Sequence, residues 1–169
     1  KEQKEWYRFF SHGLIHGDWV HFGFNIYVLY GFGKSVELSF LSILGPVKGY
    51  LNYIILYVGA LLVSSVYSYI KNQDNPHYNA LGASGAVSAV LFSFIAMYPN
   101  SDLSLLFIPI PIKGWVLGAL YLLYSHYMAK KQIDNIGHDA HFWGAVFGVV
   151  ITFVFKPELI DNFIYQITS

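Results

Sequence analysis

Three clusters of polar residues interrupt or border apolar segments of this sequence. Polar side chains are costly in such segments and usually mark function. The clusters lie at 12–25, 82–85 and 138–141 and contain His12, His16, His21, Asn25, Ser84 and His141. A serine hydroxyl becomes nucleophilic beside a base, and imidazole is the common base. Ser84 and His141 are therefore the candidates for a catalytic dyad.

The residues around this serine could also stabilise negative charge. Ser84 follows a polar loop and begins an apolar segment, and the first backbone N–H groups of a helix have no intrahelical acceptor. His21 and Asn25 are four residues apart, so they would share one face of a helix. Imidazole and amide N–H groups are suitable donors to a developing oxyanion. We expect His21 and Asn25 to supply side-chain donors to an oxyanion, and backbone N–H groups at the start of the helix could bind it beside the Ser84 hydroxyl.

Other roles for these residues stay open from the sequence. Histidines four residues apart suit zinc geometrically, but no His-Glu-x-x-His pattern is present and asparagine is a poor zinc ligand. His12 and His16 precede the apolar segment, where hydrogen bonding within a loop is the plainer role. The Gly-Ala-Ser-Gly of 82–85 could be a helix-packing patch, because small residues let backbones approach. We expect neither a metal nor another cofactor.

The segment after the third cluster carries a packing pattern. Gly144 and Gly148 lie on roughly the same helical face as His141, and small residues with this spacing favour close helix contact. A helix that begins at the candidate serine, with Gly85 in its first turn, is a fitting partner. Asp139 either lies inside the helix and points to another face or caps its N-terminus. In both cases we expect it not to complete a triad.

The composition indicates the environment of these residues. The 169-residue chain carries 10 Lys+Arg and 10 Asp+Glu, with 55% hydrophobic, 19% aromatic and only 12% charged residues. Its mean hydropathy is +0.44, whereas about 25% of residues are charged in a typical soluble domain. These values exclude a disordered chain and a basic nucleic-acid binder. They favour a membrane-embedded protein.

Runs without charged residues indicate the elements that would position the clusters. A membrane-spanning helix needs roughly 20 residues, with a range of about 17–25. We predict an all-α, polytopic bundle in a single domain over 1–169, with a membrane-associated loop at 1–20. The expected spans are about 21–36, 50–70, 84–98, 112–129 and 140–155. Gly45-Pro46 separates the first two, and the prolines at 109 and 111 predict an extended stretch before the fourth.

Over about residues 6–155 the chain resembles the rhomboid family of intramembrane serine proteases. The shared pattern comprises Arg8, His16, His21, Asn25, Gly82, Ser84, Gly85, His141, Gly144 and Gly148. The resemblance implies that Ser84 is the nucleophile and His141 the base. It implies that His21, Asn25 and the backbone N–H of Ser84 form the oxyanion hole. It also implies that Arg8 and Glu37 anchor the first loop, and that a first core helix precedes this sequence.

The resemblance further implies a serine endopeptidase that cuts transmembrane proteins near the outer end of a helix. The expected partners are transmembrane substrates and the lipid bilayer, with no nucleic acid. We expect a multi-pass integral protein of the bacterial inner membrane. One position departs from the family. An aromatic residue often packs on the base from the position of Ser88, so another side chain must hold His141.

Two other functions compete with a protease. A catalytically inactive rhomboid-like protein would bind transmembrane clients, but such relatives usually lose the serine or the histidine, and both are present here. A transporter could line a path with histidine and asparagine. Its intramembrane acidic residues are missing, since Glu37 alone lies near a span.

Overall fold

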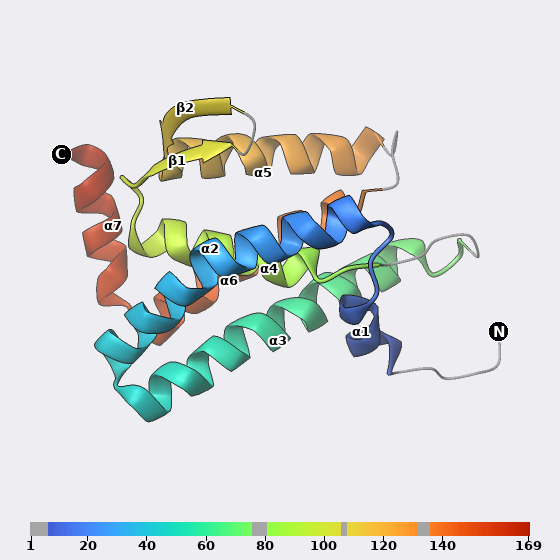
Figure 1. The fold of residues 1–169 in the computed structure, drawn as a ribbon, viewed down its shortest axis with the longest axis horizontal. Helices are drawn as coiled ribbons and strands as arrows, with labels where there is room; N and C mark the ends of the chain where they lie inside the picture. Colours follow the sequence, from blue (N-terminus) through green and yellow to red (C-terminus); the bar gives the residue numbers. More distant parts are fainter. Residues whose placement is uncertain (1–6, 76–80, 106–107, 132–135) are drawn as a thin grey trace.

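The computed structural model describes residues 7–75, 81–105, 108–131 and 136–169, so Trp6 and the start of the first loop lie outside it. Figure 1 shows the arrangement. The helices are α1 Arg8–Ser11, α2 Trp19–Leu44, α3 Pro46–Asn72, α4 Ser84–Met97, α5 Gly114–Lys131, α6 His138–Phe155 and α7 Glu158–Thr168. A 3₁₀ turn, His12–Leu14, follows α1, and two short strands, β1 Asp102–Leu105 and β2 Ile108–Lys113, precede α5. The predicted all-α bundle is confirmed.

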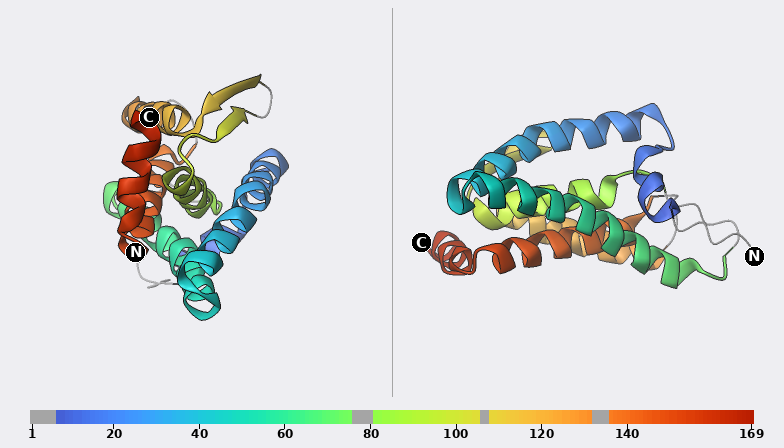
Figure 2. Two further views of the ribbon diagram at one scale, coloured as in Figure 1. Left: turned by 90° about the vertical axis from the view of Figure 1, so that its left-hand side faces the viewer. Right: turned by 90° about the horizontal axis from the view of Figure 1, so that it is seen from below.

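Helix α4 is the centre of the bundle. It lies among α2, α3, α5 and α6 in the end-on view (Figure 2). Eleven of its fourteen residues are buried, and they are mostly small or apolar. An apolar helix without a polar face is typical of a buried element. Ser84 is the first residue of this helix, so the candidate nucleophile lies at the start of the most buried of the described helices.

The ends of α2 follow from local chemistry. Asp18 is its N-cap, and the carboxylate accepts a hydrogen bond from the backbone N–H of His21 at 2.8 Å. Gly45 ends α2 with a φ of 80°, which favours glycine, and Pro46 begins α3. Proline is favoured at the first helical position because its missing N–H would be unpaired there anyway. The predicted break at Gly45-Pro46 is confirmed.

Two helices, Pro46–Asn72 and His138–Phe155, are long and apolar enough to cross a membrane, and Ser84–Met97 is a shorter apolar helix. Large apolar side chains are exposed on the outer faces of the bundle, among them Ile54 on α3 and Leu123 on α5. Lipid rather than water is a suitable solvent for such a surface. The five expected spans overlap α2 to α6, although α2 continues beyond the first span to Leu44 and the fourth span begins in β2. The residues at which each helix enters and leaves the bilayer stay a prediction.

Two elements extend the predicted bundle. The proline-containing stretch is extended, as predicted, and it forms β2, which pairs antiparallel with β1. Asp102 and Lys113 face each other in this hairpin and form an ion pair of 2.8 Å. Helix α7, which no charge-free run predicted, crosses the end of the bundle opposite α1 (Figure 1). Its Phe163 packs on Phe153 of α6 with ring centroids 6.0 Å apart.

Candidate active site

Ser84 is the first residue of α4, and a glycine with a positive φ precedes it by two positions. Gly82 has a φ of 93°, which L side chains rarely adopt. A Cβ atom at Gly82 would lie 2.5 Å from Cε1 and 2.9 Å from Nε2 of His21. The backbone before the serine thus lies directly against the His21 ring. This contact brings the first and second clusters together.

Helices α4 and α6 touch through their backbones. A Cβ atom on Gly144 would overlap the carbonyl oxygen of Gly85 and lie 2.7 Å from its carbonyl carbon. A Cβ atom on Gly148 would overlap the carbonyl oxygen of Ala89 in the same way, and it would lie 2.7 Å from the Ala89 Cα. The predicted packing role of Gly144 and Gly148 is confirmed.

This backbone contact brings the second and third clusters together. Gly85 follows Ser84, and a Cβ atom on it would lie 3.1 Å from the carbonyl oxygen of Ala140, which precedes His141. Ser84 opens α4, and His141 lies in the first turn of α6. The two candidate catalytic residues therefore occupy adjoining first turns of two interlocked helices.

The first cluster lies partly buried beside the serine loop. The rings of His16 and His21 are in edge-to-face contact, with centroids 5.2 Å apart. Asn25 is 4% exposed, and its Nδ2 has no hydrogen-bond partner among the described residues. Few buried polar groups in folded proteins lack a hydrogen-bond partner, and a functional role is one explanation for such a group. Across the described ranges, no group of three or more His, Asp or Glu side chains is arranged to hold a metal ion.

Two rings contact the candidate base. The Tyr121 ring stacks on His141 with centroids 6.5 Å apart and an interplanar angle of 27°. The His138 ring meets His141 edge to face at 6.1 Å. Ser88, which stands where an aromatic was expected, bonds the Tyr121 hydroxyl at 2.9 Å. In the described structure, the aromatic ring stacked on His141 is thus that of Tyr121, on α5, which no local sequence pattern identified.

Asp139 does not cap α6. The N-cap is Gly137, and Asp139 lies in the first turn. Its carboxylate forms an ion pair of 2.5 Å with Lys71 at the end of α3, and Lys71 also donates to the carbonyl of Ala129 in α5 at 2.9 Å. Of the two alternatives considered for Asp139, the capping role was therefore wrong and the position inside the helix was right. Through Lys71, the N-terminal end of α6 is joined to the C-terminal ends of α3 and α5.

The first loop is attached to α3 through His12. Its Nε2 lies 2.8 Å from Oγ of Ser65, and its carbonyl accepts the backbone N–H of Gly82 at 3.0 Å. Burial lowers the pKa of His12, because desolvation disfavours the charged imidazolium. A hydrogen-bonding role was expected for this histidine, but its side-chain partner lies on α3 and not within the loop. His12 also links the loop to Gly82, two residues before the candidate nucleophile.

Arg8 and Glu37 are not brought together. Arg8 precedes Phe9, whose ring lies 5.6 Å from that of Tyr69 on α3. Glu37, on α2, lies beside Tyr53, and Tyr53 precedes Tyr69 by sixteen residues on α3. At 1.5 Å per residue, these points are about 24 Å apart along α3. Helix α2 thus carries Glu37 away from the loop, so this separation does not support the expected anchoring role of Glu37, which stays a prediction.

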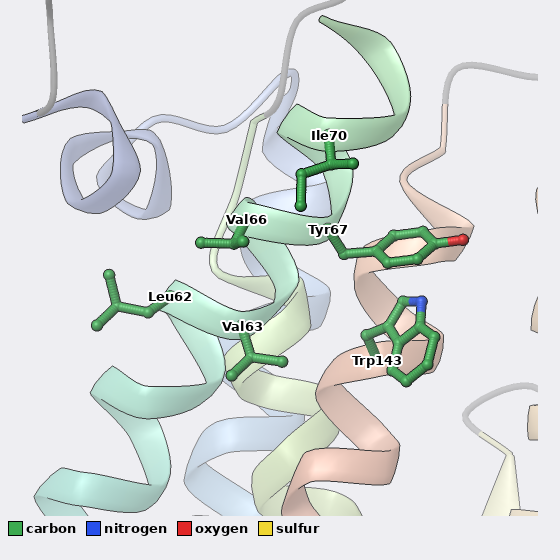
Figure 3. A pocket seen from close by; sticks show the side chains of 6 residues that line it. All are labelled: Leu62, Val63, Val66, Tyr67, Ile70 and Trp143. Carbon is green, nitrogen blue, oxygen red and sulfur yellow. The ribbon is translucent and has the colours of Figure 1, made fainter.

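Two cavities lie away from these residues. An open groove of about 310 Å³ between α3 and α6 is lined by Leu62, Val63, Val66, Tyr67, Ile70 and Trp143 (Figure 3). A second hollow of about 360 Å³ lies between α2 and α4 and includes Ser39, whose hydroxyl is 2.8 Å from that of Tyr98. Neither cavity is lined by Ser84 or His141.

These contacts define a helical membrane bundle with Ser and His on adjoining helix ends. The Rhomboid domain family model matches residues 3–158, so the chain belongs to the rhomboid family. It is a multi-pass integral membrane protein.

The chain is similar to several curated proteins. It is 30% identical over 145 residues to the presenilin-associated rhomboid-like protein, mitochondrial, of Mus musculus, covering 83% of this chain and 34% of that protein. It is 27% identical over 138 residues to rhomboid protein 1, mitochondrial, of Saccharomyces cerevisiae, covering 80% and 38%. It is 27% identical over 160 residues to rhomboid-like protein 11, chloroplastic, of Arabidopsis thaliana, covering 88% and 52%.

The chain thus spans about a third of the length of the first of these relatives. Their names place them in mitochondria or chloroplasts, so they do not support the expected bacterial inner membrane.

Proposed function

We propose that this chain is an intramembrane serine endopeptidase that cleaves transmembrane proteins with Ser84 as nucleophile and His141 as base. The observation that carries the proposal is the backbone contact of Gly85 with Ala140, which holds the first turns of α4 and α6 together. Such a contact fixes the separation of the two functional residues without depending on flexible side chains. Membership of the rhomboid family supports the same reaction class.

In the proposed reaction, Ser84 Oγ attacks the scissile carbonyl carbon while the His141 imidazole takes the hydroxyl proton. The resulting oxyanion is stabilised by the Asn25 amide, the His21 ring and the N–H of Ser84. The C–N bond then breaks, and His141 gives its proton to the leaving amine. Water hydrolyses the ester with His141 again acting as base. The buried, unpartnered Nδ2 of Asn25 supports the oxyanion assignment.

The test is cleavage of a transmembrane reporter by the full-length protein in liposomes, with fluorophosphonate labelling of Ser84 in parallel. Ser84→Ala and His141→Ala should each abolish turnover while the melting temperature stays unchanged. The double variant should be little worse than either single variant, because the two residues act as a unit. Asn25→Ala should slow turnover by roughly 10²–10³, the usual cost of one oxyanion donor.

Two matched controls separate chemistry from packing. Ser93→Ala removes a hydroxyl from the same α4–α6 contact, where it lies 2.7 Å from that of Thr152, and His126→Ala removes an exposed histidine. Both should keep most of the activity. Turnover by Ser84→Ala after contaminating proteases are excluded would overturn the proposal. A wild-type protein that binds transmembrane clients but neither cleaves nor labels would instead be an inactive rhomboid-like protein.

A further inference from the structure

Tyr121 joins three helices at one point beside the candidate base. It lies within α5, its ring stacks on His141 of α6, and its hydroxyl is 2.9 Å from Ser88 Oγ of α4. The centroid distance of 6.5 Å is within the range of about 4.5–7 Å over which aromatic rings attract. The tyrosine is therefore held at its hydroxyl end while its face meets the imidazole.

The orientation of this tyrosine is fixed from α4. Ser88 is 6% exposed and lies one helical turn after Ser84. A serine hydroxyl is too short to pack on an imidazole ring, but it can orient a phenol. The Phe92 ring, one turn further along α4, also packs on Tyr121 with centroids 5.5 Å apart. Two successive turns of the helix that carries the candidate nucleophile thus position Tyr121.

We propose that Tyr121 is the positioning residue for His141, and that Ser88 aligns it through the hydroxyl hydrogen bond. This assignment rests on the proposed protease function. Tyr121 touches neither substrate nor the scissile bond in this scheme. It restricts rotation of the imidazole, so that the ring nitrogen is aimed at Ser84 when the substrate arrives.

The assignment makes the aim of the base depend on α5, which carries neither catalytic residue. The end of α5 is tied to the bundle by Lys71, which donates to the Ala129 carbonyl at 2.9 Å. A displacement of α5 would remove the Tyr121 ring from His141 and leave the glycine contacts of α4 with α6 intact. In this scheme the orientation of the base therefore depends on a helix that carries neither catalytic residue.

Four variants test this assignment. Tyr121→Leu removes the ring and should lower both kcat and the rate of fluorophosphonate labelling of Ser84 by roughly 10–100-fold, the range that a small misplacement of a reacting group causes. KM for the reporter should not change. Tyr121→Phe and Ser88→Ala should each lose less than about tenfold, because they keep the ring and remove one hydrogen bond. Tyr127→Leu removes an exposed tyrosine of the same helix and should behave as wild type.

The double variant Tyr121→Phe/Ser88→Ala sharpens the test. Both changes remove the same hydrogen bond, so their effects should not add. A purely structural role for Tyr121 would instead lower the melting temperature and leave the labelling rate per folded molecule unchanged. That result would overturn the assignment, as would equal labelling by Tyr121→Leu and Tyr127→Leu.

A spectroscopic readout separates this assignment from the protease function. The Tyr121 ring should shift the NMR resonances of the His141 ring protons through its ring current, in wild type and in inactive Ser84→Ala alike. Tyr121→Leu should abolish that shift. If the shift is present but wild-type protein neither labels nor cleaves, the protease function fails and the contact stands. If the His141 resonances are the same in wild type and Tyr121→Leu, the positioning assignment is wrong.

Discussion

The contacts that α6 makes with α4 differ in kind from those it makes with α5. Against α4, the backbone of Gly144 meets the backbone of Gly85, so that no methyl group would fit between them. Against α5, the contact beside the site is a stack of two rings whose centroids are 6.5 Å apart, supported by one hydroxyl hydrogen bond from α4. One contact is rigid and has no side-chain freedom, and the other depends on side chains that can rotate.

This difference divides the two requirements of a serine–histidine pair between two interfaces. The separation of the residues depends on backbone contact, which changes only if the helices themselves move apart. The aim of the imidazole depends on a ring contact with a third helix. Substitutions at the first interface should therefore act mainly on stability, and substitutions at the second mainly on rate.

The largest effect is expected at the backbone contact. Gly144→Ala places a Cβ atom against the Gly85 carbonyl, so α4 and α6 must separate. Overpacking of this kind typically costs about 1–3 kcal/mol, which lowers the melting temperature by roughly 2–12 °C in a chain of this length. Thermal unfolding in detergent measures this fall in melting temperature.

Gly31→Ala is the matched control for Gly144→Ala. A Cβ atom at Gly31 of α2 meets nothing within 4 Å, and alanine favours a helix over glycine by about 1 kcal/mol. Gly31→Ala should therefore melt at or above the wild-type temperature. Equal melting of Gly144→Ala and wild type would show that α4 and α6 do not touch through their backbones.

A smaller effect is expected at the ion pair that ties α6 to α3. Asp139→Asn removes the charge that Lys71 neutralises, and both side chains are partly exposed. An ion pair of this kind contributes at most about 1 kcal/mol, so the melting temperature should fall by no more than about 2–4 °C. Turnover should stay close to wild type, because Asp139 faces α3 rather than the base. A triad aspartate would behave differently, since replacing it with asparagine lowers kcat about 10⁴-fold in serine proteases that use a Ser-His-Asp triad.

The smallest effect concerns pH and the first loop. Burial holds the pKa of His12 below its ordinary value of about 6.5. The unfolded chain therefore binds this proton more readily than the folded chain. The contribution of neutral His12 to the free energy of unfolding is fully present above about pH 6.5, and it is lost as the pH falls through the folded pKa. His12→Gln keeps a donor to Ser65 but does not titrate. Between pH 7 and 5, wild type should lose more in melting temperature than His12→Gln, because only the wild-type imidazole takes up a proton. Identical losses would contradict a titrating His12.

Much of the scaffold could be predicted from local patterns. The runs without charge predicted the helices of the bundle, Gly45-Pro46 predicted the break after α2, and the glycines of α6 predicted its close packing. Helix α7 was missed because its pattern is amphipathic, with Glu158 and Asp161 among the isoleucines, so it has no charge-free run. The pairing of β2 with β1 was missed because strand pairing is a long-range contact that an extended stretch does not specify.

Around the site, too, some features could be recognised from the sequence and others could not. The types and spacing of Ser84, His141 and Asn25 could be recognised from the sequence, because a helix presents residues at fixed intervals and small residues imply backbone contact. The tertiary structure alone decided that Tyr121 contacts the base, that Asp139 pairs with Lys71, and that Glu37 lies far from Arg8. Each of these facts depends on how one helix is rotated and shifted against another. That rotation is set by the packing of the whole bundle, and no local pattern contains it.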